Sequence, residues 1–225
     1  MNYLKQDNTQ SPTPKNNRLV VSYLMLRKSV GCLGMGLPFI LALGGGLLFD
    51  LPIQPSISDY YHTSMRDVFV GVLFAMGVFL FSYKGYGKQD NWAANIAAVC
   101  VIGTALFPTT PLDPSGLAAT IGKVHIAFAT VYFITLAYFS LVLFTKSDPT
   151  RPATPQKLRR NAVYRVSGYT ILLAIVLLVL LKLLPVDFKT SLQTFDPVFW
   201  LEAVMVIAFG ISWYVKGEGI LKDER

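Results

Sequence analysis

Six long apolar segments run through this chain of 225 residues and limit what it can fold into. The segments are Ser29–Phe49, Val68–Tyr83, Trp92–Phe107, Val124–Thr145, Val166–Leu184 and Pro197–Val215. A helix needs about 20 mostly apolar residues to cross a hydrocarbon core of about 30 Å. A backbone inside lipid must also satisfy its own hydrogen bonds, which favours helices. We therefore expect an all-α integral membrane protein, built as a bundle of six transmembrane helices.

The composition agrees with a membrane protein and argues against a soluble domain. Hydrophobic residues make up 53% of the chain and charged residues only 15%, which is too apolar for a soluble domain of this length. The net charge of +7 does not indicate a nucleic-acid partner, because the basic residues gather in connections that a membrane topology places in the cytoplasm.

The distribution of Lys and Arg predicts the orientation. The N-terminal tail, the 84–91 turn, the 146–165 loop and the C-terminus hold sixteen basic residues, whereas the three opposite connections hold four. Because cytoplasmic loops carry the excess of basic residues, both termini are predicted to be cytoplasmic. We expect a multi-pass protein of the inner (plasma) membrane, with a disordered cytoplasmic tail at 1–18, a transmembrane domain at 19–216 and a second cytoplasmic tail at 217–225.

A polar stretch, Pro55–Asp67, lies between the first two apolar segments and is unusual for its position. It contains two aspartates, an arginine, three serines, two tyrosines and one of the two histidines of the chain. Charge beside a membrane span is costly unless it is paired or faces a cavity. The stretch therefore indicates either a solvated loop with a helix cap or a polar site at the outer membrane face.

Three ionisable residues share a depth near this outer face. Asp67 lies in the first turn of the second segment, His125 lies near the start of the fourth, and Glu202 follows Pro197 by five residues in the sixth. Each has an ordinary structural interpretation, such as a bond to a carbonyl or to a headgroup. Together they predict a shared pocket in which His125 acts as base or hydrogen-bond donor and Asp67 or Glu202 orients it or shares its proton.

The same pocket is predicted to bind a ligand through Ser58, Tyr61 and Arg66. The planar guanidinium of Arg66 is suited to an anionic headgroup. We also expect Arg66 or Lys123 to pair with the carboxylates of Asp67 and Glu202, because a partly desolvated carboxylate at that depth favours a nearby cation. Arg66 is the better candidate, and Glu202 its expected partner, because a guanidinium can bind a carboxylate through two hydrogen bonds. A metal site is a weaker alternative: zinc could use His62, Asp67, His125 and Glu202 as nitrogen and oxygen ligands. Both cysteines, Cys32 and Cys100, lie in apolar segments and indicate no metal or disulfide framework.

Several short sequence motifs along the chain form a recognisable pattern. They are Ser56-Ile57-Ser58, Tyr60-Tyr61, 66–71, 77–86, 106–109, His125 at the start of the fourth segment, 199–202 and 209–213. In these motifs the chain resembles an uncharacterised family of bacterial six-span membrane proteins, over residues 30 to 216. The resemblance implies the fold and little about activity.

Two more distant resemblances bear on function. The chain looks like the DRAM and GPI-lipid-remodelling group in its Pro55–Ser58 motif, in His125 and in six spans with inward termini. This resemblance implies lipid handling at the outer face. Ser58 and His62 have the Ser-xxx-His spacing of the CREST membrane hydrolases, in which zinc is bound. That group has seven spans and a late His-xxx-His pair, and this chain has neither.

Two classes of function follow. The first is a protein that binds or modifies a membrane lipid in the outer-face pocket. The alternative is a transporter or sensor for protons or a small solute. It is less favoured, because the central thirds of all six segments lack Asp, Glu, Lys, Arg and His, whereas transporters place their sites near the midplane. A CREST-like metal-dependent hydrolase is the third possibility.

Overall fold

The structure, a computed structural model, describes residues 14–85, 87–111, 113–147, 150 and 152–221, and the side chains from residue 23 onward. Every regular element in these residues is helical. The elements are α1 (Pro14–Phe49), the 3-10 turn η1 (Ser58–His62), α2 (Arg66–Ser82), α3 (Lys88–Leu106), α4 (Gly116–Tyr138), the π-helical turn η2 (Phe139–Leu143), α5 (Pro155–Leu183), α6 (Val186–Gln193) and α7 (Pro197–Lys216).

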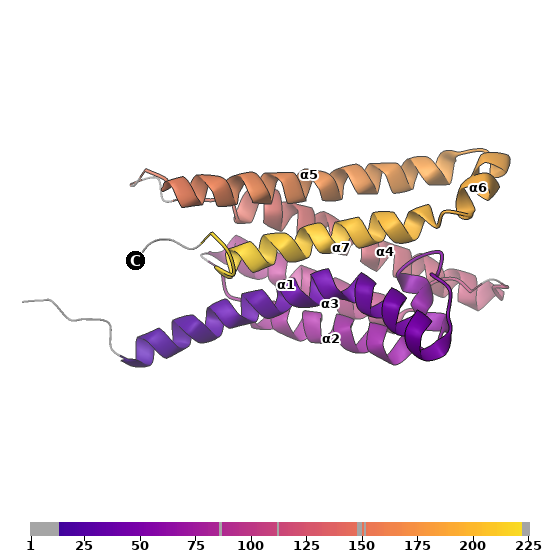
Figure 1. The fold of residues 1–225 in the computed structure, drawn as a ribbon, viewed down its shortest axis with the longest axis horizontal. Helices are drawn as coiled ribbons and strands as arrows, with labels where there is room; N and C mark the ends of the chain where they lie inside the picture. Colours follow the sequence, from indigo (N-terminus) through magenta and orange to yellow (C-terminus); the bar gives the residue numbers. More distant parts are fainter. Residues whose placement is uncertain (1–13, 86, 112, 148–149, 151, 222–225) are drawn as a thin grey trace, which may run out of the picture.

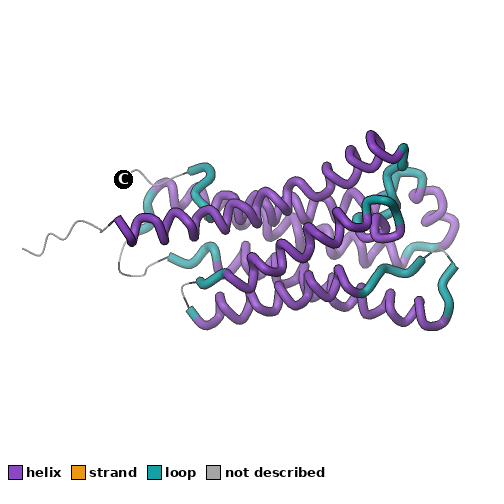
Figure 2. Tube along the Cα trace, turned by 90° about the horizontal axis from the view of Figure 1, so that it is seen from below, coloured by secondary structure: helices purple, strands orange, loops and turns teal. Residues whose placement is uncertain are grey.

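Six long helices lie side by side in one elongated bundle, and α6 is a short helix at one end (Figures 1 and 2). Packing contacts follow the order α1, α2, α3, α4, α5, α7 and back to α1, so the helices form a closed ring. The start of α1 and the end of α7 lie at the same end of the bundle, which we call the terminal end (Figure 1). The opposite end, where α1 leads to α2, α3 to α4 and α5 to α7, is the distal end.

Four of the described helical segments are long and apolar enough to cross a membrane: Tyr23–Phe49, Gly116–Leu143, Pro155–Leu183 and Pro197–Lys216. They correspond to four of the six predicted spans. The other two predictions fall on α2, which has 17 residues, and on α3, which begins with polar residues. The regular structure in the described ranges is thus all helical, with four candidate membrane spans.

Helix ends differ from the predicted spans where polar residues flank an apolar core. Helix α1 begins at Pro14, inside the predicted tail, and continues without interruption past Pro38. Residues 1–13 of that tail and 222–225 of the C-terminal tail lie outside the described residues. Helix α5 begins at Pro155, well before Val166, after the side chain of Thr154 caps it by accepting from the Lys157 N–H. Polar residues can continue a helix where its backbone bonds are satisfied, so hydropathy alone underestimates its length.

Small residues allow the closest helix contacts. Helix α3 lies between α2 and α4 and buries Ala93, Ala94, Ala97 and Ala98, as their spacing predicts. Helices α1 and α7 meet at Gly31 and Gly210, where a Cβ on Gly210 would lie 2.6 Å from the Gly31 carbonyl oxygen. No side chain fits between these backbones, so glycine is required for the two helices to pack.

Candidate functional site

The polar stretch after α1 folds into a compact turn at the distal end. The turn η1 is held by buried Ile57, Tyr60 and Met65, and Tyr60 packs against Phe199 of α7 with ring centroids 6.3 Å apart. Burial raises the pKa of the Tyr60 phenol above its ordinary value. Ser56 Oγ donates to Asp59 Oδ2 at 2.8 Å and accepts from the Asp59 N–H at 3.0 Å. Apolar anchors and local hydrogen bonds thus place Ser58 in a defined position.

Ser58 and His125 form a hydrogen-bonded pair across two elements. His125 Nε2 lies 2.9 Å from Ser58 Oγ, and His125 Nδ1 lies 2.6 Å from the Phe107 carbonyl oxygen. A carbonyl oxygen only accepts, so Nδ1 carries the hydrogen, and in a neutral ring Nε2 is left to accept the Ser58 hydroxyl hydrogen. Ser58 is 9% exposed and His125 is 3% exposed. The pair is therefore oriented and largely shielded from bulk solvent.

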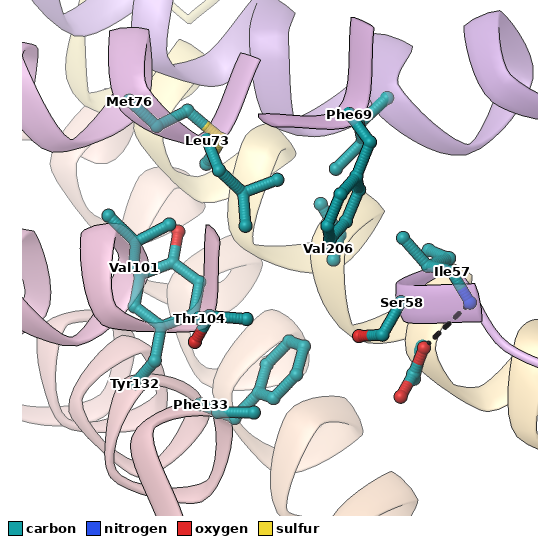
Figure 3. A pocket seen from close by; sticks show the side chains of 13 residues that line it. Ile57, Ser58, Phe69, Leu73, Met76, Val101, Thr104, Tyr132, Phe133 and Val206 are labelled. Atoms are coloured by element: carbon teal, nitrogen blue, oxygen red, sulfur yellow. Dashed lines mark hydrogen bonds between the residues drawn. The ribbon is translucent and has the colours of Figure 1, made fainter. Parts of the chain in front are cut away.

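Glu202 approaches the same turn from α7 but bonds to backbone. Its Oε2 accepts the Ile57 N–H at 2.8 Å, drawn as the dashed line in Figure 3. The Phe199 N–H donates to the Pro55 carbonyl oxygen at 3.0 Å. The first two turns of α7 thus hold the residues that lead into η1.

A large cavity of about 560 Å³ opens beside the Ser58–His125 pair. We call it the distal cavity. Its polar lining residues include Ser56, Ser58, Asp59, Thr109, Thr110, His125, Lys182, Lys189 and Glu202. Its apolar wall comes from α4, α5 and α7, through Ile126, Ala129, Phe133, Ile175, Leu178, Val179, Leu181, Val198 and Met205. The lining is therefore amphipathic, because it combines charged and hydroxyl-bearing side chains with hydrocarbon.

A second, much smaller cavity of about 40 Å³ lies deeper in the bundle (Figure 3). Apolar side chains such as Phe69, Leu73, Met76 and Val206 form most of its lining. Ser58 and Glu202 line both cavities, so they stand in the wall between them.

Three other predicted residues lie away from this pair. Arg66 is exposed, donates to the Tyr61 hydroxyl at 3.0 Å and lies over the Tyr61 ring at 4.7 Å. Asp67 is exposed as well. None of the three lines either cavity near Ser58. The structure thus divides the predicted set into Ser58, His125 and Glu202 on one side and Tyr61, Arg66 and Asp67 on the other.

The predicted ion pair between Arg66 and Glu202 is absent. Among the residues whose side chains are described, the ion pair that forms is Lys146 with buried Asp90, at 3.4 Å. Glu202 accepts a hydrogen bond from the Ile57 N–H, and Arg66 is exposed enough to stay hydrated. The Glu202 carboxyl group thus bonds to the Ile57 backbone and not to Arg66.

The four residues considered for zinc do not gather either. His62 is exposed and its Nε2 lies 2.9 Å from the Thr109 carbonyl oxygen, while both nitrogens of His125 are used by Phe107 and Ser58. Within the described part of the chain, no three His, Cys, Asp or Glu side chains are grouped so that they could hold a metal ion. The zinc hypothesis has no support from this geometry.

Two lysines of the distal cavity were not predicted as part of the site. They are Lys182 near the end of α5 and Lys189 in α6. The sequence did contain a signal for these lysines. Both are among the four basic residues in the connections opposite the predicted cytoplasmic side. Asp59, Thr109 and Thr110 carried no comparable signal, because their role depends on how three separate connections fold together.

Comparisons of this chain with protein-family models, with curated proteins and with solved structures found no match.

Proposed function

We propose that this chain is a six-span protein of the inner membrane whose distal end faces the outer side. Helices α2 and α3 run alongside the four candidate spans (Figure 1). Helix α2, with 17 residues, is about 26 Å long at 1.5 Å per residue, a small mismatch that a bilayer accommodates by thinning. The excess of Lys and Arg in the connections of the terminal end supports a cytoplasmic location for that end.

We further propose that the distal cavity binds a membrane lipid with an anionic headgroup. The observation that carries this proposal is the amphipathic lining of a cavity of about 560 Å³, a size typical of ligand pockets, which span about 300–1,000 Å³. Lys182 and Lys189 supply positive charge for a headgroup, and the apolar wall from α4 and α5 supplies a surface for an acyl chain. In the sequence this role was assigned to Arg66, which does not line the cavity.

The transport alternative has less support from the arrangement. The charged groups that line the two cavities beside Ser58 are Asp59, Lys182, Lys189 and Glu202, all near the distal end. The deeper cavity holds only about 40 Å³ and is surrounded by apolar side chains. Such an arrangement supports binding from one face rather than passage across the bundle.

A titration with a short-chain phosphatidylglycerol tests the charge assignment, with phosphatidylcholine of equal chain length as the neutral comparison. We expect the detergent-purified protein to prefer the anionic lipid. In the Lys182→Gln, Lys189→Gln double variant its Kd should rise about 25-fold, because each lysine beside an anionic headgroup contributes about 1 kcal/mol, roughly fivefold.

The matched control is Lys123→Gln. Lys123 is exposed near the start of α4 and does not line the cavity, so its replacement should leave the Kd within about twofold. An equal loss in the control and the double variant would mean that general surface charge, and not the cavity, attracts the lipid.

A further inference from the structure

Ser58 and His125 have the relationship that a serine nucleophile and its general base require. The hydroxyl oxygen lies 2.9 Å from Nε2, and the Phe107 carbonyl oxygen at 2.6 Å from Nδ1 sets the tautomer that leaves Nε2 able to accept a proton. In a triad the third group is usually a carboxylate; here a backbone carbonyl orients the ring. Both side chains line the distal cavity, so a bound molecule can reach them.

The purely structural alternative is that the pair only ties η1 to α4. The turn is already attached by two other means: the Glu202 carboxylate on the Ile57 N–H and the Phe199 N–H on the Pro55 carbonyl oxygen. A hydroxyl–imidazole bond at the wall of an open cavity is not needed to hold the turn. The Ser58–His125 hydrogen bond also leaves the distal cavity beside it unfilled.

We propose that Ser58 and His125 form an acyl-transfer site that acts on an ester of the lipid in the distal cavity. This inference rests on the proposed lipid binding. Ser58 Oγ attacks the ester carbonyl carbon while His125 Nε2 takes the hydroxyl proton. The ester C–O bond then breaks, the acyl group stays on Ser58, and His125 returns the proton to the departing alcohol oxygen. A water molecule, deprotonated by His125, attacks the acyl-serine and releases a fatty acid, and the proton returns to Ser58.

Glu202 acts as a positioning residue in this proposal. Its carboxylate accepts the N–H of Ile57, the residue before Ser58, whereas the two ring nitrogens of His125 bond to Phe107 and Ser58. It therefore fixes where the Ser58 hydroxyl stands and does not take part in the proton transfers.

Labelling with a fluorophosphonate, a reagent that phosphorylates activated serines, tests the nucleophile. Ser56 is the internal control, because it also lines the cavity and is 9% exposed, as Ser58 is, but its hydroxyl donates to Asp59. Peptide mass spectrometry of the intact detergent-purified protein should find the label on Ser58 and not on Ser56. In His125→Gln the rate should fall at least about 100-fold, the lower range for loss of a general base.

Three results would overturn the proposal: no label on Ser58, equal label on both serines, or an unchanged rate in His125→Gln. A second test keeps His125 in place, in case its replacement prevents folding. In Ser58→Cys the imidazole should activate the new thiol, so iodoacetamide should modify it at least about tenfold faster than the thiol in Ser56→Cys. Equal rates would contradict the proposal, and peptide mapping separates these thiols from Cys32 and Cys100.

Turnover of phosphatidylglycerol identifies the substrate class. We expect fatty acid release by the wild type and none by Ser58→Ala. If phosphatidylglycerol binds but Ser58 is not labelled, acyl transfer is wrong and lipid binding stands. If Ser58 is labelled but no lipid binds, the lipid proposal and the lipid ester as substrate are both wrong.

Discussion

Glu202 shows how the role of a single residue depends on what faces it. Its depth predicted a pocket, and its charge predicted a cation partner. In the structure its carboxylate instead accepts from the backbone of η1, at 2.8 Å from the Ile57 N–H. A sequence position predicts how deep a side chain lies in the membrane, but not its direction around the helix axis. For that reason His125 and Glu202 face Ser58, whereas Asp67, at a similar depth, is exposed.

The Glu202 contact predicts a specific loss of stability. Glu202→Ala removes the acceptor and leaves a partly buried N–H unsatisfied, which should lower the free energy of unfolding by about 1–3 kcal/mol. Glu202→Gln keeps an acceptor oxygen and should lose less. Thermal melts in detergent measure both, and equal losses in the two variants would mean that the hydrogen bond is not what Glu202 contributes.

Because Arg66 and Glu202 do not form a pair, we expect the stability losses of their two substitutions to be additive. Arg66→Ala removes an exposed contact with Tyr61 and should cost at most about 1 kcal/mol. Combined with Glu202→Gln, the two losses should add to within about 0.5 kcal/mol, since the groups share no partner. A coupling energy above that value in the double-mutant cycle would mean that Arg66 and Glu202 do form an ion pair.

At the scale of the elements, the apolar runs predicted the positions of the long helices. They did not predict the short elements or the contacts between helices. Helix α6 was missed, because Val186–Gln193 is short and mixed in polarity. The π-helical turn η2 was missed because its apolar residues, Phe139–Leu143, continue the composition of the fourth apolar segment. Gly31 of α1 lies at the contact with α7.

The α1–α7 contact predicts opposite effects for two glycine substitutions. In Gly210→Ala the new Cβ would meet backbone atoms of Gly31 and Met35 at 2.6 Å, so the helices must separate, with a loss of about 1–3 kcal/mol. In Gly71→Ala on α2 the new Cβ has nothing within 4 Å, and helix propensity should stabilise the protein by up to about 1 kcal/mol. Detergent melts in which both variants lose stability equally would contradict the packing explanation.

At the scale of the whole molecule, the orientation in the membrane is open to direct measurement. Ser64 is exposed at the distal end, and Ser147 is exposed at the terminal end. With Cys32 replaced by serine, a membrane-impermeant maleimide applied to intact cells should label Ser64→Cys and spare Ser147→Cys. Labelling of Ser147→Cys alone would reverse the orientation, and labelling of both would contradict the proposed topology.

The central claim is that a lipid occupies the distal cavity, and a cavity-filling substitution tests it most directly. Ala129 lines the cavity, whereas Ala127, two residues earlier in α4, is exposed and does not. Native mass spectrometry of protein extracted with its own lipids should find bound lipid in the wild type and in Ala127→Trp, and none in Ala129→Trp. Lipid retained by a folded Ala129→Trp variant, or absent from the wild type, would contradict the claim.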